Sequence, residues 1–135
     1  MSLTEKERGE IVKLRLEKAN ETFAEIPVLM INKFYRTAAN RLYYACYYAA
    51  TALLINDGYE THTHSGVKTL LGLHYLTNNK IDKSFGKMYR QLFNLRQTGD
   101  YEDWGKLEEE DIEPFLDPAE CFISTIEKLI KETGE

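Results

Sequence analysis

The chain has 135 residues, of which 43% are hydrophobic and 29% are charged, and its formal net charge is −5. This size and composition suit one globular domain with a single buried core. No apolar run approaches the roughly 18 residues that cross a bilayer, and the charged residues 1–8 are unlike a signal peptide. We therefore expect one cytoplasmic domain over residues 1–135, with no membrane partner.

Apolar residues recur every three or four positions along most of the chain, which predicts helices and no strand. The first helix is expected over residues 4–26. Thr4 and Glu7 are spaced as a capping box at its start, and Pro27 is expected to end it.

The longest helix is expected over residues 30–57, with Gly58 directly after its end. Apolar residues surround most of its circumference, which is typical of a helix at the centre of a bundle. Its expected core positions are Tyr35, Ala38, Ala39, Leu42, Ala45, Cys46, Ala49, Ala52 and Leu53.

Three further helices are expected over residues 65–76, over residues 82–96 and from Asp117, which is interpreted as an N-cap before Pro118. The polar residues 97–114 are expected to form a mobile loop or a frayed helical extension. Cys46 and Cys121 are interpreted as unpaired core residues. The predicted fold class is therefore all-α, an antiparallel up-and-down bundle of about five helices around one long central helix.

The net charge conceals an uneven distribution. Residues 27–99 hold nine Lys or Arg and three Asp or Glu, a local charge of +6, whereas residues 100–135 hold three and thirteen, a local charge of −10. An acidic total argues against nucleic-acid binding, but a local basic face can still attract phosphate. The acidic tail is interpreted as a solvated helix face with a solubilising loop.

Two short segments carry the strongest functional signal. They read NRLYYA at residues 40–45, within the long predicted helix, and RQTGDY at residues 96–101, at a helix end. In this order and in a small all-helical chain, they resemble the HEPN superfamily, in the branch with (Ser/Asn)-Arg-x-Tyr-Tyr-Ala and Arg-x-x-x-Asp-Tyr motifs. The resemblance covers roughly residues 8–130.

Active HEPN members carry Arg-x(4–6)-His at the end of this helix and act as dimeric, metal-independent endoribonucleases. The resemblance implies that Arg96 holds the scissile phosphate and offsets its growing charge. Here Tyr101 stands where the histidine would be, preceded by Asp100. A tyrosine with the ordinary pKa of about 10 is a poor base at neutral pH. Asp100 and Tyr101 are therefore candidates for proton transfer or positioning, and a plain salt bridge between Arg96 and Asp100 is the alternative. No cofactor is expected.

Asn40, Arg41, Tyr44 and Tyr48 lie on the less apolar side of the long predicted helix. Arginine beside aromatic rings can hold bases, so these four are candidates for binding RNA or a nucleotide. The alternative is packing in a dimer seam or against the helix over residues 82–96. The two interpretations are compatible, because the resemblance places the functional groove at a homodimer interface.

A second function follows from the same resemblance. Many HEPN proteins of this branch pair with a minimal nucleotidyltransferase in toxin–antitoxin or defence-type modules. The chain would then be a binding module rather than an enzyme. In some such pairs the partner adds AMP to a tyrosine near the motif, which makes Tyr101 the modification candidate.

The three histidines lie at positions 62, 64 and 74. This spacing, with no cysteine near, is not that of a zinc site, and no metal site is expected. His64 precedes a predicted helix whose N-cap is Thr63 or Ser65. We expect a structural role for it, hydrogen-bonded to the second or the fourth predicted helix.

Overall fold

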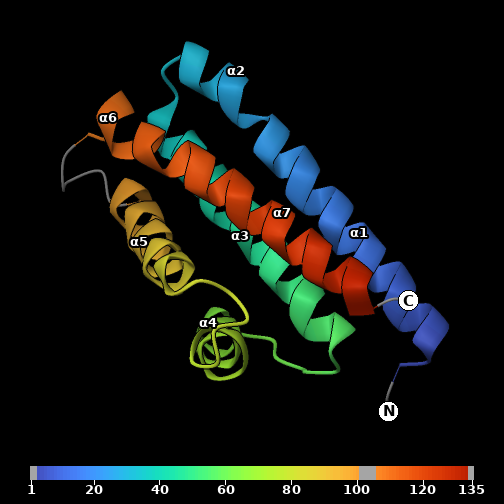
Figure 1. Cartoon of the computed structure of the whole chain (residues 1–135). Helices are drawn as coiled ribbons and strands as arrows, with labels where there is room; N and C mark the ends of the chain where they lie inside the picture. Colours follow the sequence, from blue (N-terminus) through green and yellow to red (C-terminus); the bar gives the residue numbers. More distant parts are fainter. Residues whose placement is uncertain (1–2, 101–105, 134–135) are drawn as a thin grey trace.

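The computed structural model describes the backbone of residues 3–100 and 106–133 and the side chains of residues 3–98 and 106–133. The described residues form helices and no strand: α1 (Glu5–Ala24), α2 (Ile26–Ile31), α3 (Tyr35–Asn56), α4 (His64–Leu71), η1 (Gly72–Leu76), α5 (Lys83–Asp100), α6 (Glu109–Ile112), η3 (Glu113–Phe115) and α7 (Leu116–Thr133). The long helices α1, α3, α5 and α7 alternate in direction along the bundle (Figure 1). The predicted all-α, up-and-down fold is confirmed.

Helix α3 lies at the centre, with α1, α5 and α7 packed around it (Figure 1). The expected core positions of α3 are all buried except Tyr35, which is half-buried. Several are alanines, and such small side chains let the axes of neighbouring helices approach closely. The same helix therefore contacts three others while one of its sides still carries large aromatic residues.

The capping box at the start of α1 is confirmed. The Glu7 amide donates to the Thr4 hydroxyl at 3.1 Å, and the Thr4 amide donates to the Glu7 carboxylate at 2.9 Å. The role expected of Pro27 is wrong. Proline lies in the first turn of α2, where its missing N–H needs no intrahelical partner. Helix α3 consequently begins at Tyr35, after Lys33 with φ of 61°, and not near residue 30.

Three other boundaries differ from the prediction. The helix over residues 65–76 is α4 followed by the π-helical turn η1. The polar residues 97–114 contain the last turn of α5 and the whole of α6. Asp117 is no N-cap, because η3 runs directly into α7 and places Asp117 inside the helix.

The two cysteines are free, as expected, but only Cys46 belongs to the core, since Cys121 is exposed on α7. Among the described residues, no helix is both long enough and apolar enough to cross a membrane.

Candidate functional site

Arg96 lies in the last turns of α5 and reaches the aromatic side of α3. Its Nη1 donates a hydrogen bond to the Tyr44 hydroxyl at 3.2 Å. Its guanidinium carbon lies 5.3 Å from the ring centre of Tyr43, 5.6 Å from that of Tyr44 and 5.4 Å from that of Phe93. These distances are those of cation–π contacts, so three rings hold the arginine in place.

Aromatic side chains fix the position of the Arg96 guanidinium, but no acidic side chain that the structure describes neutralises its charge. Its Nε is buried and makes no hydrogen bond, and no described carboxylate pairs with the guanidinium. Buried polar groups without a partner are rare in folded proteins. A guanidinium held in this way is suited to bind a phosphate or carboxylate through charge-assisted hydrogen bonds.

The candidates from the first motif line one side of α3 next to Arg96. Arg41 donates to Asn40 Oδ1 from Nε at 3.1 Å and from Nη2 at 2.8 Å. The Arg41 guanidinium carbon also lies 5.7 Å from the Tyr44 ring centre, so Tyr44 has a guanidinium near it from each of two helices. Further along, the Tyr44 and Tyr48 ring centres are 5.9 Å apart, and Lys18 Nζ lies 4.7 Å from the Tyr48 ring.

His64 joins this group from α4. The Thr63 hydroxyl caps α4 by accepting from the Gly66 amide at 2.9 Å, which sets His64 in the first turn. His64 Nδ1 lies 2.8 Å from the Tyr43 hydroxyl. The predicted hydrogen bond from His64 to the long central helix is thus confirmed. We name the half-buried group formed by Asn40, Arg41, Tyr44, Tyr48, His64 and Arg96 the basic–aromatic face.

The environment of His64 also involves Arg96, which sequence reasoning missed. The pKa of His64 is held below its ordinary value, first by burial and then by the positive charge of Arg96. His64 is therefore neutral at pH 7. The sequence offered one signal for this proximity, because His64 was expected to bond to the second or the fourth predicted helix, and these two helices carry NRLYYA and Arg96.

Two tyrosines beneath this face are fully embedded in the core. Tyr43 and Tyr89 are 0% and 2% exposed. Burial raises the pKa of Tyr43 to about 12, and burial also places the pKa of Tyr89 well above its ordinary value. Both hydroxyls therefore remain protonated at neutral pH.

The remaining sequence candidates lie apart from this group or beyond the described residues. The backbone of Asp100 closes α5, but its side chain and all of Tyr101 lie outside the described residues. His74 stacks on Tyr59 with ring centres 4.2 Å apart, and His62 is exposed. In the described part of the chain, no three His, Cys, Asp or Glu side chains gather as metal ligands would.

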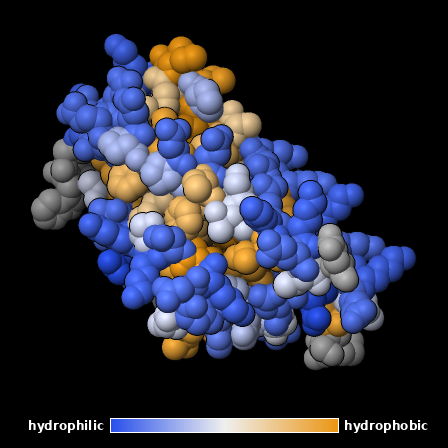
Figure 2. Space-filling model, viewed as in Figure 1, coloured by the Kyte–Doolittle hydropathy of each residue, from blue (hydrophilic) through white to orange (hydrophobic). Residues whose placement is uncertain are grey.

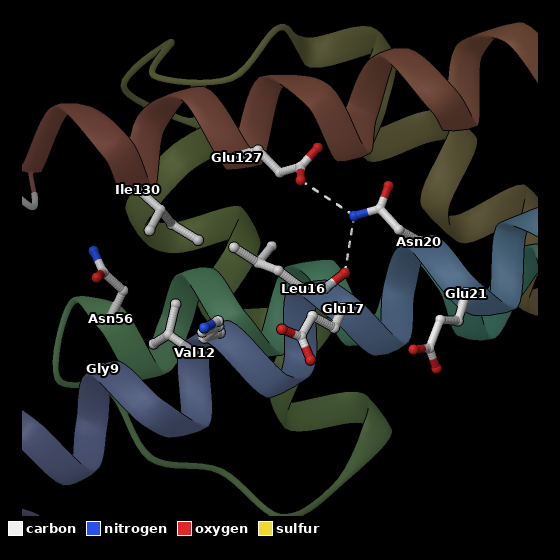
Figure 3. A pocket seen from close by; sticks show the side chains of 10 residues that line it. Gly9, Val12, Leu16, Glu17, Asn20, Glu21, Asn56, Glu127 and Ile130 are labelled. Atoms are coloured by element: carbon white, nitrogen blue, oxygen red, sulfur yellow. Dashed lines mark hydrogen bonds between the residues drawn. The ribbon is translucent and has the colours of Figure 1, made fainter.

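A hollow elsewhere in the molecule does not suit the same ligands. A volume of about 570 Å³ lies between α1 and α7, where Asn20 donates to Glu127 at 3.1 Å and to the Leu16 carbonyl at 2.9 Å (Figure 3). Glu17, Glu21 and Glu127 line it against a single Lys13. Such an acidic lining repels phosphate, so the basic–aromatic face is the better candidate site.

Comparison with known families agrees with this geometry. A model of the HEPN domain matches residues 12–129, nearly the whole chain. The chain belongs to the HEPN family. A UPF0332 protein of Thermotoga maritima is 35% identical over 93% of this HEPN protein and 96% of its own length. Putative toxin MJ0605 of Methanocaldococcus jannaschii is 33% identical over 97% of each chain. Putative toxin MJ0142 of the same organism is 28% identical over 91% of this chain and 83% of its own.

Proposed function

We propose that this HEPN protein is a toxin-like protein of a toxin–antitoxin or defence-type module that cleaves RNA without a metal ion. The observation that carries the proposal is the guanidinium of Arg96, which three aromatic rings hold beside Tyr44 without a carboxylate partner among the described residues. A phosphodiester bound there would meet a preorganised positive charge. Such charge stabilises the extra negative charge that develops on phosphorus in the transition state.

The basic–aromatic face supplies the rest of an RNA-binding surface. Tyr44 and Tyr48 offer rings on which bases can stack, and Arg41 and Lys18 place cations beside those rings. Asp100 and Tyr101 follow Arg96 by four and five positions in the sequence, and we assign them positioning or proton-transfer roles. We expect the active form to be a homodimer in which the two copies bring their Arg96 sites together.

The test is cleavage of a fluorescent single-stranded RNA in EDTA by the wild type, Arg96→Ala and Arg96→Lys. We expect Arg96→Ala to lose at least about 100-fold in cleavage rate, as when a transition-state donor is removed. Lysine keeps the charge but not the forked donors, so Arg96→Lys should recover only part of the loss. Arg90→Ala, on the exposed side of the same helix, is the matched control and should cleave normally.

Equal cleavage by Arg96→Ala and the wild type would overturn this proposal, as would the absence of cleavage by the purified homodimer. Measuring mass by light scattering in the same preparation tells whether the sample is the expected dimer.

A second candidate function is the binding of a minimal nucleotidyltransferase as the antitoxin partner. It is favoured by an apolar patch at the α2 end of the molecule, where Val28, Ile31 and Phe34 are 61%, 80% and 57% exposed. Figure 2 shows hydrophobic residues gathered at this end, over α2. Exposed apolar side chains that gather in one patch, unlike singly scattered ones, are typical of a surface that binds another protein.

Co-expression with a nucleotidyltransferase encoded beside this gene tests the second function. We expect the two proteins to co-purify, Ile31→Glu to weaken the complex, and Leu73→Glu, at another exposed apolar position, to leave it intact. Intact-mass measurement of the same sample would reveal AMP added at Tyr101. Co-purification that Ile31→Glu leaves unchanged would exclude α2 as the contact, and separate elution of the wild-type proteins would refute the partnership.

A further inference from the structure

His64 is the one imidazole held on the basic–aromatic face, and its ring is fixed on several sides. Its Nδ1 lies 2.8 Å from the Tyr43 hydroxyl, and its ring centre lies 4.5 Å from that of Tyr47 and 5.7 Å from that of Tyr44. With Nδ1 occupied, Nε2 makes no hydrogen bond with any described residue. The imidazole is therefore oriented by the fold with one nitrogen left for a ligand.

His64 and Arg96 share two neighbours. The ring centre of Tyr43 lies 5.7 Å from the His64 ring and 5.3 Å from the Arg96 guanidinium carbon. The ring centre of Tyr44 lies 5.7 Å from the His64 ring and 5.6 Å from the same carbon. Two tyrosines thus connect an imidazole on α4 with a guanidinium on α5, although the two residues are 32 positions apart in the sequence.

We propose that His64 supplies the proton-transfer group of the site, with Nε2 accepting the ribose 2′-hydroxyl proton while Arg96 binds the neighbouring phosphate. This inference rests on the proposed ribonuclease function and deepens it. A histidine contributed from the start of α4 would then take the role of the histidine that is absent from the sequence after Arg96. The substrate class is RNA, because DNA has no 2′-hydroxyl.

The step balances without a co-reactant. The 2′-hydroxyl loses its proton to Nε2 as its oxygen forms a bond to phosphorus, and the bond from phosphorus to the 5′-oxygen breaks. The 5′-oxygen leaves with the electron pair and takes a proton from water, and the hydroxide left behind recovers the proton from His64. The products are a 2′,3′-cyclic phosphate and a 5′-hydroxyl. The step uses the tautomer in which Nδ1–H donates to the Tyr43 hydroxyl oxygen, so that Nε2 of the neutral ring carries no proton. Tyr43 is then a positioning residue, because this hydrogen bond fixes both the ring and the tautomer.

The surroundings of His64 suit a base at neutral pH. The groups that face it are the hydroxyl of Tyr43 and the rings of Tyr44 and Tyr47 on α3, and the guanidinium of Arg96 on α5. None of these is a carboxylate that would hold a proton on the ring. Burial and the charge of Arg96 both lower the pKa of His64, so the unprotonated form should persist until the pH falls below the ordinary value of about 6.5.

The test compares wild type, His64→Gln and His64→Ala on a single-stranded RNA and on the same sequence with 2′-deoxy sugars. Glutamine keeps a polar side chain near Tyr43 but cannot act as a base. We expect His64→Gln to bind RNA within about twofold of the wild type and to lose at least about 100-fold in kcat. The cleavage rate of the wild type should decrease at pH values below about 6.5. Added imidazole should restore part of the activity of His64→Ala. His62→Gln, at an exposed position two residues before His64, is the matched control and should cleave normally.

The outcomes separate the two proposals. Cleavage by His64→Gln at the wild-type rate and with the same pH profile overturns the role of His64 while leaving the Arg96 ribonuclease intact. Loss of RNA affinity together with kcat, without imidazole rescue, assigns His64 a structural role and also overturns the inference. Cleavage of the 2′-deoxy substrate overturns the assigned chemistry, and no cleavage by the wild type overturns both proposals. Thermal melting of each variant by circular dichroism shows that the fold is retained.

Discussion

At the scale of single residues, Tyr43 belongs both to the core and to the candidate site. Its side chain is 0% exposed, and its ring lies 5.7 Å from Tyr89 and 5.6 Å from Phe93. Its hydroxyl nevertheless reaches His64, which satisfies a polar group that would be costly to bury alone. Close packing fixes the position of the Tyr43 ring. The His64 imidazole and the Arg96 guanidinium contact this ring, so their positions are fixed as well.

Gly58 is a second residue with a defined task, the termination of α3. Its φ is +87°, its amide donates to the Ile55 carbonyl at 3.1 Å, and the Tyr59 amide donates to the Leu54 carbonyl at 2.9 Å. This is a Schellman ending, in which glycine avoids the left-handed strain of other residues. We expect Gly58→Ala to lower the free energy of unfolding by about 1–2 kcal/mol, measured by urea denaturation.

Gly9→Ala is the control for that experiment, because the same substitution should have the opposite sign. Gly9 lies within α1, and a Cβ there would meet no atom within 4 Å. Alanine in an exposed helix interior should stabilise by about 0.5–1 kcal/mol. Destabilisation at both positions would show that backbone conformation is not what distinguishes them.

At the scale of elements, one side of α3 packs against the neighbouring helices and another side forms part of the candidate site. Its alanines, such as Ala45 and Ala49, face the neighbouring helices and are fully buried. Its tyrosines at positions 44, 47 and 48 are half-buried and form the basic–aromatic face with α4 and α5. Small residues on one side and aromatic residues on the other are a pattern that periodicity analysis can find. The buried stripe was predicted correctly except at Tyr35, which is half-buried, and Asn40, Arg41, Tyr44 and Tyr48 were predicted on the less apolar side.

Helix boundaries were less predictable than the helices themselves. Pro27 was expected to end a helix, yet it lies in the first turn of α2. Proline fits a first turn because its missing N–H needs no partner there, whereas it disrupts a helix interior. Asp117 followed by Pro118 has the pattern of a helix start, but the chain is already helical through η3. In both cases tertiary packing decided between two local structures that the same residues allow.

At the scale of the whole molecule, the core contains ionisable groups that the fold keeps neutral. Burial raises the pKa of Tyr43 to about 12, and it also raises the pKa of Tyr75, Tyr89 and Cys46 well above their ordinary values. Tyr75 also gains a hydrogen bond from its hydroxyl to Asp57. In the unfolded chain these side chains would ionise near their ordinary values, about 10 for tyrosine and 8.5 for cysteine.

This difference predicts alkaline unfolding. Because the folded pKa values are raised, the unfolded state loses protons first, and stability should fall as the pH rises from about 9 to about 12. Each group that ionises only in the unfolded state adds a slope of about 1.4 kcal/mol per pH unit. Urea midpoints by circular dichroism should therefore drop over this range, with tyrosinate absorbance at 295 nm rising in the same transition. Tyrosinate that appears fully before the helical signal is lost would contradict the prediction.

The sequence by itself determined the helical class, the central position of the long helix, its buried stripe and the family, because these depend on periodicity and on short motifs. It also singled out Arg96 and the residues around Tyr44. Only the tertiary structure decided that His64, from a different helix, shares two aromatic neighbours with Arg96. The reason is physical: periodicity specifies which face of a helix is buried, whereas the contacts between faces depend on how side chains of particular shapes pack against one another.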